Sequence, residues 1–301
     1  MAYTQGDTIT ASDYNTFATN VNAVIGTGSG TSGYGLTEIT SISAGDTISA
    51  AQWNSLLSGL QKAATHQGTS VTNASNTVST GGNILPLSNL EADITAITTN
   101  KANAAGANMS TGQAGTSSSR TSAWTSNVNH IFTVTFASAN AARFFFNSGG
   151  KIKFAFSRSG GSSTDQNTSW TNLLSGVGTV TFANTASGSS GSVGFENLTG
   201  SDQAIFNSAV GSGDYSANDV NINAKMSGAV ITMEVDFNDD HVAETGTFTG
   251  GGLGNAPNEG QAYTGSDSVD GTLSSTITFD KADNASAVQV ASPSFATTTN
   301  L

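Results

Sequence analysis

The sequence predicts a mainly β protein with a small α-helical N-terminal part, in which two repeated short helices and a short coiled-coil-like helix precede an antiparallel β-sandwich. Three observations predict this fold. They are a duplicated segment with helix-start signals, a polar stretch with almost no apolar residues, and period-two alternation of apolar and polar residues beyond it. We expect a helical attachment and oligomerisation region at 1–97, a linker at 98–122 and the β-sandwich domain at 123–301.

The N-terminal part opens with an internal repeat. The segment GDTITASDYNTF begins at position 6 and returns as GDTISAAQWNSL at position 45. In the second copy, Ser49 and Gln52 have the spacing of a capping box, in which each residue's side chain bonds to the other's backbone at a helix N-terminus. Thr10 and Asp13 form a looser version of it in the first copy. Each copy is therefore predicted to begin a helix at the same point of the repeat.

The apolar residues of the two predicted helices also match across the repeat, and their i, i+3, i+7 spacing puts them on one helix face. Short helices cannot bury such faces alone, so they pack either on each other, as a small helical domain, or on a partner chain. A third pattern near residue 90 has the 3, 4, 3 spacing of a coiled coil over less than two heptads, and indicates either a core helix or a place where parallel chains meet. The candidate interface residues are Tyr14, Phe17, Val21, Trp53, Leu56, Leu60, Leu87, Leu90, Ile94 and Ile97.

Alternation of apolar and polar residues dominates the C-terminal part. Strands with one apolar and one polar face suit antiparallel sheets that bury a single side. Gly-rich turns separate the runs, as expected between the strands of a β-sandwich. The apolar members of the four clearest runs are Phe132, Val134 and Phe136; Ile152, Phe154 and Phe156; Ile231, Met233, Val235 and Phe237; and Leu273, Ile277 and Phe279.

Residues suited to chemistry are few and scattered. The chain has no cysteine, so it can form neither disulfides nor thiolate metal sites. Its three histidines, His66, His130 and His241, lie in separate segments without metal-ligand spacing, and no serine stands in a GxSxG context. A GxGxxG match at positions 28–33 follows a predicted helix, whereas the dinucleotide fingerprint needs a preceding strand. We therefore expect no enzyme, no catalytic residue, no cofactor and no bound metal.

The acidic run DFNDDH at 236–241 is the most suggestive segment. Three oxygen-bearing residues alternate from Asp236, the spacing that opens an EF-hand loop, but His241 takes the place of the turn glycine and Thr247 that of the bidentate glutamate. An EF-hand is excluded on this ground. A looser calcium site stays open beside the simpler interpretation of an acidic strand end. Glu234 and Asp236, two apart on one strand face, would be the carboxylate pair of a glycoside hydrolase.

The charge distribution indicates which classes of partner the chain can bind. The formal net charge is −12, and residues 201–301 hold 13 of the 21 acidic residues but only two basic ones. This balance provides no basic stripe for nucleic acid. No apolar run is long enough to span a bilayer, and the opening residues show neither the basic nor the apolar region of a secretory signal. We therefore expect no nucleic-acid partner and no membrane contact.

Four segments carry a family resemblance. They are the doubled GDTITASDYN and GDTISAAQWN with the following VIGTGSGTSGYG; ARFFFNSGGKIKFAFSRSGG at 142–161, followed by Asn167, Trp170 and Leu173; ITMEVDFNDDH at 231–241; and SVDGTLSSTITFDKAD at 268–283. Together they resemble virion structural proteins of tailed bacteriophages, especially marine and cyanobacterial phages. No catalytic motif is among them, so the resemblance assigns no functional residue.

The resemblance implies a tail, tail-fibre or baseplate-associated protein. Such a protein assembles in the host cytoplasm as a homo-oligomer, often a trimer, and its partners are further copies of itself and other virion tail proteins. A composition rich in Gly, with only 10% charged residues, suits such fibres. The alternatives are a host-receptor module that binds surface glycans, a head decoration or head-fibre protein, and a polysaccharide-degrading spike.

Overall fold

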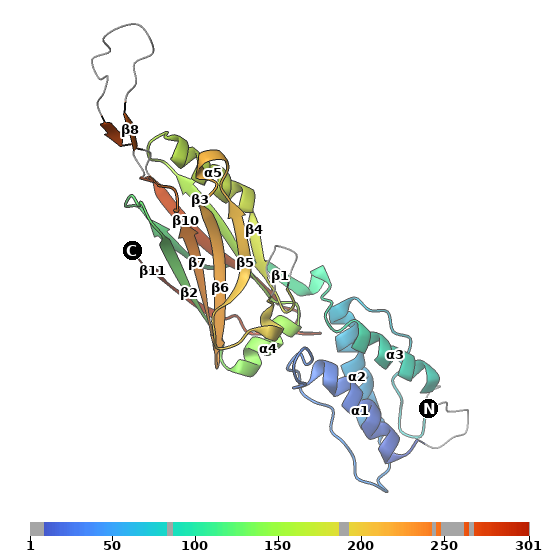
Figure 1. Ribbon diagram of the computed structural model, residues 1–301. Helices are drawn as coiled ribbons and strands as arrows, with labels where there is room; N and C mark the ends of the chain where they lie inside the picture. Colours follow the sequence, from blue (N-terminus) through green and yellow to red (C-terminus); the bar gives the residue numbers. More distant parts are fainter. Residues whose placement is uncertain are drawn as a thin grey trace.

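N-terminal helices are followed by two antiparallel β-sheets that pack against each other, in an elongated molecule with the helices at one end (Figure 1). Strands and helices contribute similar shares of the structure, so the chain is mixed α/β and the expectation of a mainly β protein is corrected. No helix in the described ranges is long and apolar enough to cross a membrane. The computed structural model describes residues 9–82, 87–186, 193–242, 245–247, 262–264 and 268–300.

The repeat forms two equivalent helices, α1 (Ala11–Ile25) and α2 (Ala50–Gln67), and both begin where the sequence predicts. Both capping boxes are present. The Thr10 amide donates to Asp13 Oδ2 at 2.8 Å, and the Ser49 amide donates to Gln52 Oε1 at 2.8 Å. The looser Asp version therefore closes as fully as the Gln version, because the shorter side chain still reaches the backbone amide three residues before it.

A third helix, α3 (Leu87–Thr99), packs across α1 and α2 to complete a three-helix bundle (Figure 1). The Tyr14 hydroxyl lies inside the bundle and donates to the carbonyls of Thr40 and Gln52 at 3.3 and 3.2 Å. A polar tip on a buried aromatic ring needs such acceptors. The bundle is therefore fixed by specific hydrogen bonds as well as by apolar burial.

Both sheets are antiparallel, with register shifts in the pairing of β1 with β10 and of β5 with β6. One has the order β1-β10-β3-β4 and the other β11-β2-β7-β6-β5, with a separate two-stranded sheet β8-β9 at the end of the molecule away from α1, α2 and α3 (Figure 1). The strands are β1 (Met109–Arg120), β2 (Val128–Thr135), β3 (Lys151–Ser159), β4 (Thr179–Phe182), β5 (Gln203–Val210), β6 (Asp219–Ser227), β7 (Val230–Asn238), β8 (Thr245–Thr247), β9 (Ala262–Thr264), β10 (Thr272–Ala282) and β11 (Ser294–Asn300).

Aromatic side chains from both sheets meet between them and form the core. Phe132 of β2 contacts Phe154 of β3 edge to face, with ring centroids 5.9 Å apart. Phe156 meets Phe237 in the same way at 5.8 Å. Edge-to-face packing of this kind adds stabilisation beyond the buried area. The predicted alternation is confirmed, because the apolar members of the four runs are all buried.

The linker expected at 98–122 is corrected by the structure. Residues 98 and 99 end α3, and 109–120 form β1, which pairs with β10 at the margin of the four-stranded sheet. A marginal strand is held by backbone hydrogen bonds and needs few apolar side chains, so its Ser, Thr and Gly content concealed it. What remains between bundle and sheets is the short stretch 100–108.

Two helices in the β region were not predicted. Helix α4 (Ala139–Asn147) buries Phe145 and Phe146 among the core aromatics, and α5 (Asp165–Val177) buries Trp170. Ala142, Phe145 and Phe146 have the i, i+3, i+4 spacing of one helix face, and Ser138 caps the helix by accepting from the Ala141 amide at 3.0 Å. Both of these helix signals are local, and they stand beside the more conspicuous alternation of the strand that follows.

Candidate functional site

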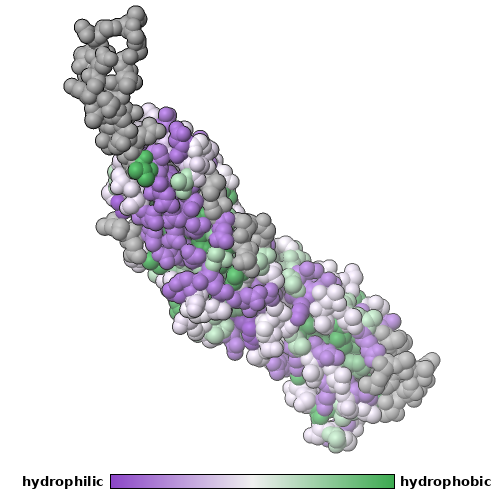
Figure 2. Space-filling view, viewed as in Figure 1, coloured by the Kyte–Doolittle hydropathy of each residue, from purple (hydrophilic) through white to green (hydrophobic). Residues whose placement is uncertain are grey.

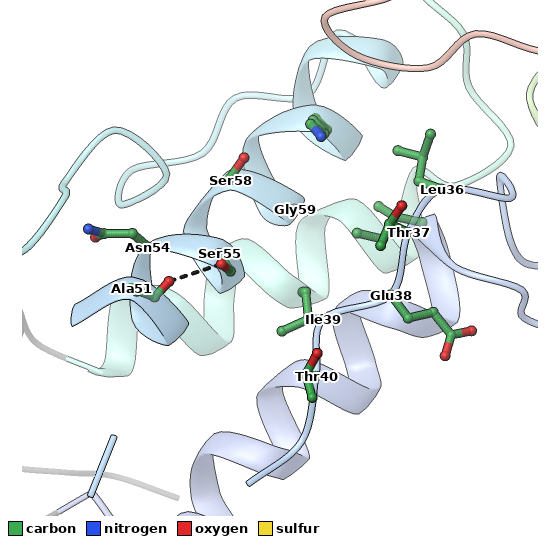
Figure 3. A pocket seen from close by; sticks show the side chains of 12 residues that line it. Leu36, Thr37, Glu38, Ile39, Thr40, Ala51, Asn54, Ser55, Ser58 and Gly59 are labelled. Atoms are coloured by element: carbon green, nitrogen blue, oxygen red, sulfur yellow. Dashed lines mark hydrogen bonds between the residues drawn. The ribbon is translucent and has the colours of Figure 1, made fainter. Parts of the chain in front are cut away.

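The candidate site is a groove of about 520 Å³ on the surface of the helical bundle (Figure 3). One wall is the exposed face of α2 between Ala51 and Lys62, and the other is the extended segment 36–40. Gly59 keeps the floor deep, because a β-carbon there would lie 2.9 Å from Ile25 Cδ1 and 3.0 Å from Ile39 Cδ1. The groove therefore depends on a glycine that the two helices need for their close approach.

Asparagine side chains hold the extended segments on the helices. Asn15 pairs with Ile42 through both polar atoms of its side-chain amide. Nδ2 donates to the Ile42 carbonyl at 2.9 Å, and Oδ1 accepts from the Ile42 backbone amide at 2.9 Å. Asn54 pairs in the same way with Val78, at 3.0 and 2.9 Å. Asn15 and Asn54 occupy equivalent repeat positions, in DYN and QWN. The asparagine shared by the two repeat copies is therefore the sequence signal for this pairing.

The groove is lined by small polar groups and by two side chains of opposite charge, Glu38 and Lys62. Ser55 Oγ donates to the Ala51 carbonyl at 2.9 Å (Figure 3), so this hydroxyl is already engaged. The Glu38 carboxylate accepts from the Thr27 amide at 2.9 Å, which lowers the pKa of this carboxyl. No histidine lies among the lining residues. The lining therefore combines hydroxyl and amide groups with one carboxylate and one amine.

The structure brings the predicted interface residues together inside one chain. The described side chains among them are at most 5% exposed and form the core of the three-helix bundle, whereas the side chain of Leu87 lies outside the described part of the structure. In the single chain these side chains contact one another, and contact with a second chain through them stays a prediction. The alternative expectation, a small helical domain, describes their placement.

The three histidines lie on different segments, namely α2, β2 and the residues after β7, and each has its own contacts. His66 Nε2 lies 3.2 Å from the Ser148 carbonyl, and His130 Nδ1 lies 2.8 Å from Ser275 Oγ. Burial lowers the pKa of both imidazoles to about 4. His241 contacts the Tyr215 ring near the end of β7. Within the described ranges, no group of three or more His, Cys, Asp or Glu residues could hold a metal ion.

The residues of the acidic run 236–241 contact different neighbours. Asp239 is buried and accepts from Gln166 Nε2 at 3.1 Å and from Trp170 Nε1 at 3.3 Å, which fixes α5 at the end of β7. The His241 amide donates to Asn218 Oδ1 at 2.8 Å. Asp236 lies on the outer face of β7, as an alternating strand requires. These residues therefore form a strand end that anchors a helix, and Thr247 has no described side chain.

A polar surface covers the outer face of the five-stranded sheet, where Figure 2 shows the hydrophilic colour concentrated on the β region. Amides pair with carboxylates across neighbouring strands: Asn129 donates to Glu234 at 2.6 Å and Asn223 to Asp236 at 3.0 Å. Burial, then the charge of Glu234, raises the pKa of Asp236 to about 6. We call this surface the amide–carboxylate face; its members are Asn129, Asp219, Asn221, Asn223, Glu234, Asp236 and Asn238.

Comparison with protein-family models, with curated proteins and with solved structures finds no match for this chain. Function therefore has to be inferred from the groove, the amide–carboxylate face and the overall architecture. The groove lies on the helical bundle, and the amide–carboxylate face lies on the β region, so the two surfaces belong to different parts of an elongated molecule (Figure 1).

Proposed function

We propose that the chain is a structural component of a phage virion, namely a tail, tail-fibre or baseplate protein that assembles as a homo-oligomer, often a trimer. The observation that carries this proposal is the elongated architecture, with a helical bundle at one end and packed sheets extending from it (Figure 1). The four segments that resemble phage virion proteins occur in both parts of the molecule. The bundle is the attachment end, and the β region projects.

In this proposal the two packed sheets form an antiparallel β-sandwich. The aromatic contacts between β2 and β3 and between β3 and β7 support it, because they join the inner faces of the two sheets. The groove beside α2 is the surface through which the attachment end binds a neighbouring tail protein. Its mixed apolar and polar walls suit an interface that is buried on assembly.

Immunogold labelling tests the virion assignment. Antibodies raised against the purified chain should label the tail of phage particles in electron micrographs. Labelling of the capsid would favour the head decoration or head-fibre alternative. If the virions carry no label and the chain is detected only in the lysate, the proposal is rejected. Light scattering on the purified chain then measures the oligomer against the 30.3 kDa mass of one chain.

A second candidate function, binding of host glycans, is favoured by the amide–carboxylate face. Amide and carboxylate groups offer the donors and acceptors that sugar hydroxyls need. Fluorescent full-length chain should bind host cells, and the Asn129→Ala, Asn223→Ala double variant should bind several times more weakly. Asn20→Ala is the control, since Asn20 is exposed on α1, away from the face. Equal binding by all three proteins would exclude this face, and release of reducing sugar would favour a polysaccharide-degrading spike.

A further inference from the structure

The helical bundle and the β region meet at a junction built from two of the segments singled out in the sequence. The glycine-rich loop 26–35, which follows α1, lies against α4 of the β region. Asn147 Nδ2 donates to the carbonyls of Gly30 and Gly33 at 3.1 and 3.3 Å. Arg143 Nη1 donates to the Ser32 carbonyl at 2.7 Å. One face of α4 therefore binds successive carbonyls of a loop more than a hundred residues away in sequence.

Glycines set the backbone shape in which the loop presents these carbonyls to α4. Gly28, Gly30, Gly33 and Gly35 all have positive φ, between 51° and 100°, a region that glycine adopts without the steric cost paid by other residues. A side chain at Gly35 would collide with the Phe144 ring. The glycines thus serve docking on α4, and this accounts for the GxGxxG match without a nucleotide.

A second set of contacts joins the bundle to the sheets through Asn108. Asn108 Nδ2 donates to the Thr65 carbonyl at the end of α2 at 2.7 Å. On the opposite side, Asn108 Oδ1 accepts from Asn284 Nδ2 at 2.6 Å, and the Asn108 carbonyl accepts from the Asp283 amide at 2.9 Å. Asn108 therefore ties the last turn of α2 to the segment that follows β10, through its side chain and its backbone carbonyl.

The junction is buried as well as hydrogen-bonded. His66 and Ser148, which face each other across it, have no exposed surface, and Asn147 is 3% exposed. Buried hydrogen bonds of this kind are costly to break, because opening the junction would leave polar groups without partners. Segments joined through a flexible tether would instead expose these groups to water.

We propose that loop 26–35, α4 and Asn108 form a latch that holds the helical bundle and the β region as one rigid body, so that the direction of the β end is fixed by the bundle. Domains of one chain move relative to each other by default unless their interface is well packed, and this latch removes that freedom. Its use in aiming the projecting end of a virion component rests on the proposed function, whereas the rigidity itself does not.

The cysteine-free chain allows a direct test by electron paramagnetic resonance. Spin labels at Ser58→Cys on α2 and Ser157→Cys on β3, both exposed positions, report the distance across the junction. A second pair, Thr135→Cys with Ser157→Cys, lies within the β region and gives the width due to the labels alone. We expect equally narrow distance distributions for the two pairs. A distribution across the junction that is clearly wider than the internal one would overturn the proposal.

Variants then test whether the latch contacts cause the rigidity. The Arg143→Ala, Asn147→Ala double variant should widen the distribution across the junction about twofold, as expected when an interdomain contact is lost, and leave the internal pair unchanged. Asn20→Ala is the matched control and should change neither. An unchanged distribution in a folded double variant would reject the role of the loop. If the double variant does not fold, Arg143→Ala alone, which removes a single partly exposed side chain, decides in the same way.

The same experiment separates this proposal from the proposed function. The distance measurement uses purified chain and no virion, so rigidity can be confirmed while tail labelling fails, or the reverse. A rigid chain that is absent from virions would keep the latch and reject the virion role. A flexible chain found in tails would reject the latch alone.

Discussion

At the scale of single residues, a few polar side chains fix the backbone where no strand pairs with it. Asn15 and Asn54 each offer one donor and one acceptor to a single residue of an extended segment, which is the pairing that a neighbouring strand would provide. The sequence placed both residues at one repeat position but gave no reason for an amide there. That reason depends on where the chain returns, which local patterns do not encode.

Replacing Asn54 with alanine should lower the free energy of unfolding by about 1–3 kcal/mol, because it leaves a backbone amide and carbonyl without partners. Asn15→Ala should have a similar effect, since the two positions are equivalent. Urea denaturation followed by circular dichroism measures the change, with Asn20→Ala as the exposed control. Equal stability of Asn54→Ala and the control would contradict the role assigned to the amide.

The buried histidines should make the protein less stable in mild acid. Burial lowers the pKa of His66 and His130 to about 4, whereas in the unfolded chain each takes up a proton near 6.5. The unfolded state therefore binds more protons between these values, and stability falls as the pH drops from 6.5 to 4, by up to about 3 kcal/mol per histidine. Denaturation at pH 7 and pH 5 measures the loss. His66→Gln should show a smaller loss, and an identical one would argue against this cause.

At the scale of elements, some helices and strands could be predicted from local sequence patterns and others could not. The starts of α1 and α2 were predicted correctly because a capping box is local, and the alternating strands because burial imposes period two. Strand β1 was missed because a strand at a sheet margin needs no apolar face. Helix α4 was missed although its N-cap and its apolar face are local signals, because three consecutive phenylalanines conceal the helical spacing. The groove joins segments whose contact no local pattern reveals.

The outer face of β7 carries a charge conflict that one substitution should relieve. The pKa of Asp236 is raised to about 6 by burial and by the neighbouring carboxylates, above its value near 3.8 in the unfolded chain. Ionising it therefore costs stability as the pH rises through this range. Asp236→Asn should unfold at higher urea concentration than the wild type at pH 8, and the difference should shrink at pH 4. Asp240→Asn, an exposed change in the same run, is the control. A difference that does not depend on pH would contradict the explanation.

At the scale of the whole molecule, the stretch between the helical bundle and the β region is short, and its residues contact both parts. Strand β1 belongs to the sheets, so a β region cut after residue 122 would lose a strand that pairs with β10 along nearly its whole length. Removal of β1 would turn β10 into an unpaired edge, which is a template for association with other chains. The β region therefore begins near residue 106 and not at 123.

Two fragments test this boundary. The fragment 106–301 should be monodisperse in size-exclusion chromatography and show a cooperative thermal transition in circular dichroism. The fragment 123–301 should aggregate or unfold at lower temperature, because it exposes the edge of β10. Equal behaviour of the two fragments would show that β1 adds little to the sheet.

The pairing of β1 with β10 and of β2 with β11 also determines when this protein can finish folding. Each pair joins a strand near the start of the β region to one near the end of the chain, as in the register of Met109 with Ala282 and of Asn129 with Asn300. Contacts so distant in sequence form slowly. During synthesis, β1 and β2 leave the ribosome long before their partners exist, whereas the helical bundle can already be complete. The chain therefore carries open strands until β10 and β11 have been synthesised, and chaperones that shield such strands are expected to be needed for its production.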